Sequence, residues 1–144
     1  MRITRIKSHV LQYDLEEPLG YSQQYYTKRT THLVEVNTDI GVTGWGECFG
    51  GRNIALANRA IVELVLQPMM LGRNPLDREV LWHNAYNLMR DHGQKGMPIQ
   101  ALSGVDIALW DIAGKHFGQP IHQLLGGAFR AEIPVYGYGM MLQQ

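Results

Sequence analysis

Residues 101–115, ALSGVDIALWDIAGK, decide how this chain folds. Their apolar residues recur every three to four positions, which predicts a helix that begins at Met97 or Pro98 and runs to about Phe117. Gly118 supplies the stop signal. One side of this helix is narrow, because it carries Ala101, Gly104, Val105 and Ala108. Gly104 costs about 1 kcal/mol in a helix interior relative to alanine. We therefore expect the backbone of a neighbouring element to approach the helix on this side.

Beyond this helix the sequence predicts a short helical turn and then a strand. Residues 120–125 form the turn, and Gly126-Gly127 closes it. Residues 133–140, IPVYGYGM, have the composition of a strand. Because this strand follows the helices, no short connection joins it to strands near the N-terminus, and we expect it in a different sheet.

The first third of the chain predicts an antiparallel meander of three strands. Its strands are residues 3–11, 30–37 and 42–47, with a turn at Asp39-Ile40-Gly41 between the last two. In the second strand, one side holds Leu33, Glu35 and Asn37 and the other holds His32, Val34 and Val36. Residues 13–29 are polar and aromatic and predict a long loop, and loops of this length are usually functional or mobile.

Two further amphipathic helices are predicted between the meander and residue 97. The first ends near Pro68, and its apolar face holds Ile54, Ala57, Ile61, Leu64 and Val65. The second starts after Asn74-Pro75 and ends at residues 91–96, and its apolar face holds Val80, Leu81, Ala85, Leu88 and Met89. The predicted fold class is α+β, a three-stranded antiparallel meander followed by a helical bundle.

The composition excludes several classes of protein. Hydrophobic residues make up 45% of the chain and charged residues 18%, which is typical of a globular protein. Thirteen basic residues balance thirteen acidic ones, so nothing indicates nucleic acid or a membrane surface as a partner. No stretch approaches the roughly 18 apolar residues of a membrane span, and no signal peptide is visible. The single cysteine, Cys48, forms no internal disulfide, which fits a cytoplasmic protein.

The motifs do not assemble a complete catalytic set. Residues 44–51, GWGECFGG, are rich in glycine, but Phe49 occupies the place of the third glycine of a dinucleotide-binding loop, so a strand end with a flexible loop is the better interpretation. Glu79 and His83 have helical i, i+4 spacing, yet two groups alone do not hold a metal. We expect Cys48 to be a small buried side chain rather than a nucleophile.

Two carboxylates of the long helix also favour structural roles. Asp106 and Asp111 are five residues apart and do not face each other. Asp111 and Lys115 form an i, i+4 pair that contributes about 0.3 kcal/mol. Asp106 lies on the apolar side, where burial requires a partner, and we expect a contact to an arginine or a helix N-terminus.

Residues 21–29, YSQQYYTKR, are the segment whose composition best suits ligand contact. Tyrosines, amides and two cations match a polar, anionic ligand that bears hydroxyl groups. A surface loop that closes on its own domain explains the same composition equally well, and both interpretations stay open.

The order of these elements resembles the N-terminal capping domain of the enolase superfamily, most closely its mandelate racemase and muconate lactonizing enzyme branch. The resemblance rests on residues 41–47 (GVTGWGE), 101–112 with Gly114-Lys115, and 124–127 (LLGG), and it covers residues 1–141. It implies that residues 1–127 form a cap over a (β/α) barrel. Residues 128–144 would begin that barrel, with its first strand at about 133–140. The intact protein would then continue for roughly another 200 residues.

The resemblance also implies a chemistry. Members of this family use Mg²⁺ to remove the proton next to a carboxylate. Their metal ligands and bases lie in the barrel, so no catalytic residue or metal ligand is expected in this chain, and the segment alone should be inactive. The intact enzyme is expected to be a homo-oligomer.

In this family two loops of the cap close over the substrate and select it, and here they match residues 13–29 and 47–53. The residues expected to bind substrate are Tyr21, Gln23, Tyr25, Phe49 and Arg52, followed by His32. The expected substrate is an acid sugar. Dehydration of an aldonate or aldarate is the first expectation, cycloisomerisation of a sugar-acid lactone the second, and mandelate-type racemization the third.

Two other classes of function fit the same residues. A free-standing α+β binding module would hold a sugar acid with the tyrosine segment, and its last strand would pair inside the domain. A structural subunit would instead dock on a partner barrel through an apolar patch around Val135 and Met140.

Overall fold

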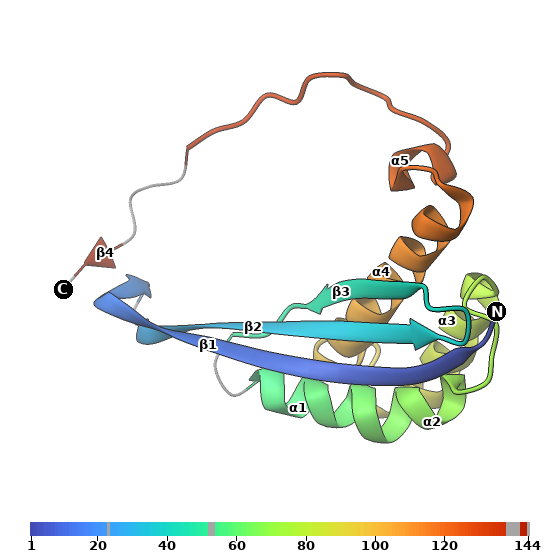
Figure 1. Ribbon diagram of the computed structural model, residues 1–144. Helices are drawn as coiled ribbons and strands as arrows, with labels where there is room; N and C mark the ends of the chain where they lie inside the picture. Colours follow the sequence, from blue (N-terminus) through green and yellow to red (C-terminus); the bar gives the residue numbers. More distant parts are fainter. Residues whose placement is uncertain (23, 52–53, 138–141, 144) are drawn as a thin grey trace.

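The computed structural model describes the chain except for residues 23, 52–53, 138–141 and 144. Strands β1 (Ile3–Tyr21), β2 (Gln24–Thr38) and β3 (Thr43–Cys48) form an antiparallel meander. The helices pack on one face of this sheet (Figure 1). The predicted α+β class with a three-stranded meander is confirmed. A two-residue strand, β4 (Leu142–Gln143), adds to the far side of β1, so the sheet order is β3-β2-β1-β4.

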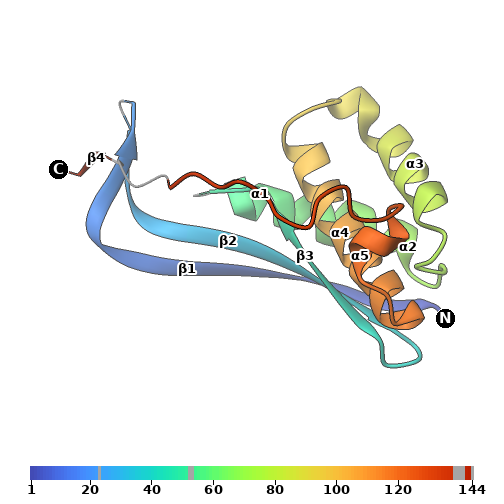
Figure 2. The same cartoon turned by 90° about the horizontal axis from the view of Figure 1, so that it is seen from above.

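The prediction of a long loop over residues 13–29 is wrong, because this segment is the outer half of a hairpin. β1 and β2 pair from Ile3 opposite Thr38 to Tyr21 opposite Gln24, with a bulge in β1 between residues 14 and 19. Figure 2 shows the strand pair extending past the helices. Since no core lies against this part, its residues need not alternate between apolar and polar, and the usual sequence signal of a strand is missing.

The inner half of β2 has the alternation that the sequence predicts. His32, Val34 and Val36 are fully buried, and the residues between them are only partly buried. The turn into β3 is closed by a hydrogen bond of 3.2 Å from the Gly41 N–H to the Thr38 carbonyl. Gly41 has a φ of 80°, a conformation that glycine adopts without strain. The meander is therefore set by one apolar strand face and one glycine turn.

The first predicted helix is longer than expected and buries a different face. It consists of α1 (Ile54–Ile61), a π-helical turn η1 (Val62–Leu66) and α2 (Gln67–Met70), so it continues through Pro68. Pro68 lies inside this continuous helix, two residues after the end of the π-helical turn, and does not end it. The buried stripe is Ala55, Asn58, Val62, Leu66 and Met70.

The predicted face of this helix lies beside that stripe, and its members Ile54 and Leu64 are 42% and 75% exposed. Two features of this helix explain why the sequence predicted the wrong face. A polar residue, Asn58, stands in the middle of the buried stripe, so a search for apolar periodicity selects the neighbouring face. The wide π-helical turn also shifts the phase of the stripe along the helix.

The other predicted helices are confirmed. α3 spans Arg78–Met89, followed by a 3-10 turn, η2 (Arg90–His92). α3 buries Leu81, Ala85 and Met89 but leaves two residues of its predicted face, Val80 and Leu88, exposed. α4 spans Met97–Phe117 and ends at Gly118, whose φ is 61°, and α5 spans Ile121–Leu124. None of the described helices has both the length and the apolar character that crossing a membrane requires.

α4 and β3 approach each other at backbone distance. A Cβ atom on Gly46 would overlap with the carbonyl oxygen of Gly104, and one on Gly44 would overlap with that of Ala108. A Cβ atom on Gly104 would in turn overlap with the sulfur of Cys48. The expectation that Gly104 marks the close approach of a neighbouring backbone is confirmed. Gly44 and Gly46 therefore serve the packing of β3 on α4.

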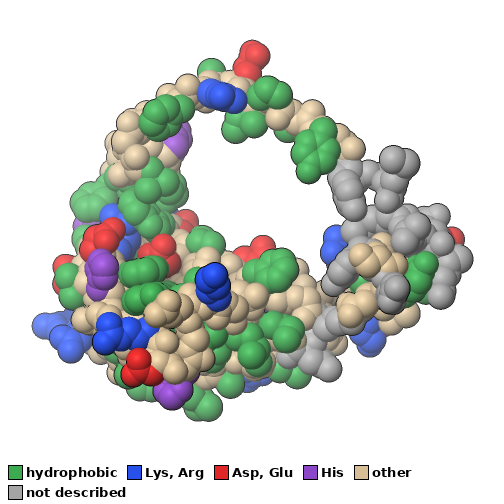
Figure 3. Space-filling model, turned by 180° about the vertical axis from the view of Figure 1, so that it is seen from behind, with side chains coloured by type: hydrophobic (Ala, Val, Ile, Leu, Met, Phe, Trp, Pro, Cys, Tyr) green, Lys and Arg blue, Asp and Glu red, His purple; other side chains and the backbone are tan. Residues whose placement is uncertain are grey.

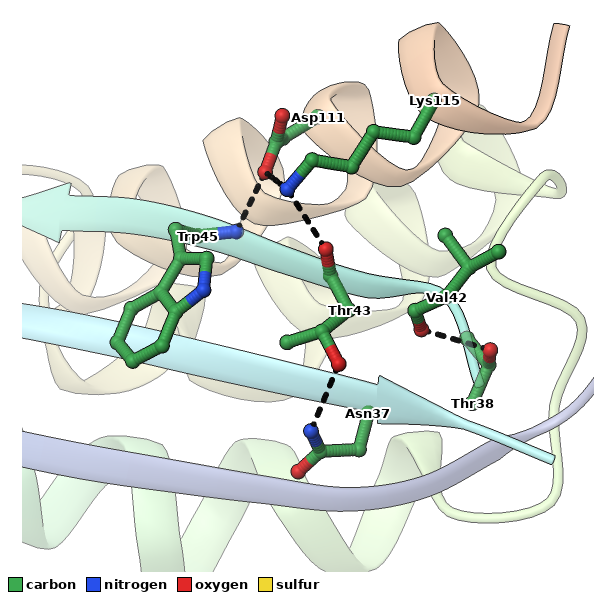
Figure 4. A network of polar contacts seen from close by, with 7 residues as sticks. All are labelled: Asn37, Thr38, Val42, Thr43, Trp45, Asp111 and Lys115. Atoms are coloured by element: carbon green, nitrogen blue, oxygen red, sulfur yellow. Dashed lines mark hydrogen bonds and ion pairs between the residues drawn. The ribbon is translucent and has the colours of Figure 1, made fainter. Parts of the chain in front are cut away.

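Asp111 and Lys115 of α4 cover the free edge of β3 (Figure 4). An edge strand leaves backbone groups unpaired. The Trp45 N–H donates to Oδ2 of Asp111 at 2.8 Å, and Nζ of Lys115 donates to the Thr43 carbonyl at 2.8 Å. The two side chains are 2.6 Å apart, so the predicted i, i+4 pair is confirmed and protects the sheet edge.

After α5 the chain leaves the folded body. The C-terminal segment arches away from the rest of the surface (Figure 3), and Phe129, Val135 and Tyr136 are 99%, 90% and 87% exposed. Residues 133–137 form no strand, and residues 138–140 lie outside the described part of the chain. The assignment of residues 133–140 to a first barrel strand therefore stays a prediction.

Candidate functional site

The tip of the β1–β2 hairpin holds the first group of predicted substrate-binding residues. Tyr21 pairs with Gln24, and Tyr25 pairs with Gly20. Tyr25 is 39% exposed, and a Cβ atom on Gly20 would lie 2.6 Å from its ring. Glycine at this position thus lets the tyrosine ring lie across the neighbouring strand. Gln23, predicted from the same segment, lies outside the described residues.

The two cations of this segment have partners within the hairpin. Nζ of Lys28 lies 3.0 Å from the carboxylate of Asp14, and both side chains are exposed. The guanidinium of Arg29 lies 5.6 Å from the centroid of the Tyr26 ring. An exposed ion pair contributes less than about 1 kcal/mol. Lys28 can therefore exchange Asp14 for an anionic ligand at little cost.

Phe49 directly follows β3, and its side chain is 76% exposed. Its carbonyl accepts a hydrogen bond of 2.8 Å from the amide of Asn58. An aromatic ring in this position offers apolar surface that a ligand can cover. Arg52, predicted from the same segment, lies outside the residues that the structure describes.

His32 is fully buried on the inner face of the sheet, opposite Cys48. Burial lowers the pKa of His32 from its usual value of 6.5, and the carboxylate of Glu63 opposes this shift only in part. Neither ring nitrogen has a hydrogen-bond partner among the described residues. A side chain in this place does not face a ligand at the surface, so we leave His32 out of the candidate site. The alternation of β2, which groups His32 with Val34, already indicated this placement.

The hairpin tip and Phe49 lie toward the same end of the sheet. β3 ends opposite His32, while β1 and β2 continue from there to the turn after Tyr21 (Figure 2). The tip therefore projects past the segment that follows β3. The two segments predicted to face substrate are brought to one end of the molecule, and we define them together as the candidate site.

A polar network on the outer face of the sheet was not predicted. The carboxylate of Glu35 lies 2.8 Å from Nε2 of His9 and accepts a hydrogen bond of 2.9 Å from Asn37. These two contacts, with Asn37 first, lower the pKa of Glu35. Asn37 also donates to Oγ1 of Thr43 at 3.1 Å, so the network crosses all three strands of the meander. The alternation of β2 indicates its outer residues, but only the strand register shows their partners.

A hollow of about 270 Å³ between α3 and α4 contains Asp106. Arg78 stacks on Trp110 there, with its Cζ atom 3.2 Å from the ring centroid. Burial raises the pKa of Asp106, and the charge of Arg78 opposes this shift. Nε and Nη1 of Arg78 have no hydrogen-bond partner among the described residues, so an arginine charge lies nearby but the expected direct contact is not confirmed. Glu79 and His83 line the same hollow. Within the described part of the chain, no three acidic, histidine or cysteine side chains are placed to hold a metal ion.

Cys48 has the environment of a structural residue. It is 1% exposed, and burial raises its pKa to about 11. The thiol is therefore protonated at neutral pH, and its Sγ donates to the carbonyl of Ala101 at 3.7 Å. The expectation of a small buried side chain is confirmed.

Several known proteins are similar to this chain in sequence and in fold. Residues 5–126 match the sequence profile described as the mandelate racemase / muconate lactonizing enzyme N-terminal domain. D-Galactarolactone cycloisomerase of Agrobacterium fabrum is 41% identical over 139 residues, which are 96% of this chain and 36% of that protein. D-Xylonate dehydratase of Haloferax volcanii is 42% identical over 106 residues, which are 72% of this chain and 24% of that protein.

Among solved structures, the 3,6-anhydro-D-galactonate cycloisomerase from Zobellia galactanivorans superimposes with a TM-score of 0.76 and 31% identity. The match covers 88% of this chain and 32% of that one. The chain thus spans about a third of the length of the relatives it matches, or less.

Proposed function

The chain belongs to the mandelate racemase and muconate lactonizing enzyme branch of the enolase superfamily, and from this membership we propose that it caps the active site of an enzyme acting on acid sugars. The observation that carries the proposal is which enzymes this chain is related to. A galactarolactone cycloisomerase and a xylonate dehydratase are each more than 40% identical to it. Both names describe reactions of sugar acids or their lactones.

The first candidate reaction is dehydration of an aldonate or aldarate. A base removes the proton from the carbon next to the carboxylate, and the hydroxyl group on the following carbon leaves as water after it takes up a proton. The enol that remains tautomerises to a 2-keto acid. No described residue of this chain is assigned as that base.

The contribution proposed for this chain is recognition of the substrate. Tyr25 and Phe49 offer exposed aromatic surface, while Tyr21 and Gln23 add groups that can bond sugar hydroxyls. The guanidinium of Arg52 complements the carboxylate.

Rearrangement of a sugar-acid lactone is the second candidate reaction. The match to the cycloisomerase covers 96% of this chain, whereas the match to the xylonate dehydratase covers 72%. The similarity to the cycloisomerase thus extends over nearly the whole chain, which supports this second candidate. Racemization of the acid is a third outcome of the same proton removal.

The proposal includes a division of the intact protein into two domains. Residues 1–127 would form the cap, and residues 128–144 would begin a (β/α) barrel whose first strand is at about 133–140. The described residues offer no fitting set of metal ligands, so no step is assigned to Mg²⁺ within this chain. The family's Mg²⁺ site is proposed for the barrel, whose open end carries the active site in such folds.

A screen of the intact protein with Mg²⁺ against aldonates, aldarates and their lactones tests the proposal. Deuterium taken up from D₂O reports proton removal: it appears at the α carbon when the acid is re-formed, and at the neighbouring carbon when the enol tautomerises to a 2-keto acid. A keto-acid assay then detects dehydration, and NMR detects lactone rearrangement. We expect deuterium uptake or product formation with at least one acid sugar, and a protein that shows neither with any of them would overturn the proposal.

A further inference from the structure

The buried stripe of α1 contains one polar side chain, that of Asn58. It is fully buried, although its neighbours in the stripe, Ala55 and Val62, are apolar. A buried amide is unfavourable unless its polar atoms are hydrogen-bonded. The contacts that Asn58 makes therefore indicate why an amide occupies this position.

The amide of Asn58 joins three segments that are far apart in the sequence. Its Nδ2 donates to the carbonyl oxygen of Phe49 at 2.8 Å and to Oε1 of Gln100 at 3.2 Å. Phe49 begins the segment after β3, and Gln100 lies in the first turn of α4. The backbone of Phe49 is thus tied to two helices of the bundle.

Gly50 shows how closely the chain lies on this amide. A Cβ atom on Gly50 would be 3.1 Å from Nδ2 of Asn58 and 3.4 Å from the Cα and N atoms of Ala55. A side chain there would force the Asn58 amide or the segment to shift by a few tenths of an ångström. At the next position, Gly51, a Cβ atom would meet nothing within 4 Å. Of these two glycines, only Gly50 is in close contact with α1.

We propose that Asn58 is a positioning residue that fixes the direction in which Phe49 projects at the candidate site. The carbonyl of Phe49 is held while its ring stays 76% exposed, so the anchor orients the ring without covering it. The link to substrate rests on the proposed function, because that function makes Phe49 a substrate contact. The anchoring itself does not depend on it.

Leucine at position 58 separates the hydrogen bonds from the packing. Its side chain has a similar size but no donor, so Asn58→Leu removes the bonds to Phe49 and Gln100 without leaving a cavity. The Oδ1 atom of Asn58 has no partner among the described residues, so no further hydrogen bond there is lost in the exchange. The matched control is Val62→Ala, which loses core packing one turn further along the same stripe.

Hydrogen exchange in the intact protein measures the anchoring directly. Asn58→Leu should speed the exchange of the peptide covering residues 47–51 by about tenfold. Val62→Ala, compared at the same interval below its own Tm, should leave that peptide within about twofold of the wild type. Equal acceleration in both variants would overturn the proposal, since Asn58 would then act only through general stability.

Gly50→Ala reaches the same contact from the other side and leaves the bundle core unchanged. It should speed exchange of the same peptide by about fivefold, whereas Gly51→Ala, at the open neighbouring position, should not. This pair decides the matter even if Asn58→Leu fails to fold. Equal exchange in the two alanine variants would contradict a close contact between this segment and Asn58.

Kinetics test the link to the substrate. With an acid sugar that the intact protein turns over, Asn58→Leu should raise KM about fivefold and change kcat less than about twofold. In a Phe49→Ala background it should add less than about twofold, because its effect acts through Phe49. Independent, multiplicative effects would overturn the positioning role. If no acid sugar is turned over, the proposed function fails, while the exchange experiments still decide the anchoring.

Discussion

The two ends of the meander are built in opposite ways. At one end β3 lies on α4 so closely that only glycines fit between the two backbones, and side chains of α4 cover the strand edge. At the other end β1 and β2 continue past the helices with water on both faces (Figure 2). In the first region, few other side chains would fit, and β3 and α4 cannot shift relative to each other. The second has no core to specify it, and it holds half of the candidate site.

This difference indicates that one region supports the fold while the other is available to contact substrate. A close-packed helix and sheet hold the base of the cap, while the residues proposed to meet substrate extend from it on the hairpin tip and the segment after β3. Stability should therefore respond to substitutions in the packed region, and substrate recognition to substitutions at the tip and at Phe49. The predictions that follow test this contrast, beginning with the largest expected effect.

Gly46→Ala should destabilise the protein by about 3 kcal/mol, at the upper end of the range for overpacking. The added Cβ atom would overlap with the carbonyl of Gly104, and neither backbone can move without shifting α4 from β3. Thermal unfolding of Gly46→Ala beside Gly51→Ala, where the added atom meets open space, measures the effect. Equal Tm values for the two variants would contradict the close packing.

Asp111→Ala should cost about 1–2 kcal/mol, because the Trp45 N–H loses its acceptor and Lys115 loses its partner. Asp111→Asn keeps an acceptor oxygen and should cost less than half as much. Urea unfolding of both variants provides the measurement. Similar losses in both would show that the charge, rather than the cover of the strand edge, is what matters.

His32 should make stability depend on pH below 6.5. Its pKa is lower in the folded protein, so the unfolded state takes up the proton first and stability falls as pH drops from 6.5 toward the folded pKa. His32→Gln should flatten this part of the Tm–pH curve. A variant curve with the same slope as the wild type in this pH range would contradict the prediction.

Lys28→Ala should change the free energy of unfolding by less than about 0.5 kcal/mol, because its ion pair with Asp14 is exposed at the outer hairpin. Circular dichroism melts of Lys28→Ala at low and high salt check this. A loss comparable to that of Asp111→Ala would mean that the hairpin supports the fold and would remove the contrast between the two ends.

The sequence was sufficient where packing imposes a pattern. α4, its end at Gly118, the close approach at Gly104 and the Asp111–Lys115 pair all follow from spacing along one helix. The outer hairpin could not be predicted, because strands without a core show no alternation. The buried face of α1 was missed for a related reason, since it is centred on the polar Asn58.

The sequence could predict which segments form the candidate site, but not which of their side chains are exposed or what holds them in place. Phe49 and Tyr25 are exposed at the end of the sheet to which both segments run, but the family resemblance also suggested His32, which lies in the core. The anchor of Phe49 was invisible in the sequence, because Asn58 and Gln100 come from helices that only the fold brings together. The network around Glu35 was hidden likewise, since it depends on strand register.

Hydrogen exchange of the intact protein, with and without Mg²⁺ and an acid sugar that it turns over, compares the two ends in one experiment. Peptides covering residues 19–26 and 47–51 should gain protection of about tenfold with ligand. Peptides of α4 should change by less than about twofold, because that region is already fixed. Protection gained along α4, with none at the hairpin tip or around Phe49, would contradict a substrate site at this end of the cap.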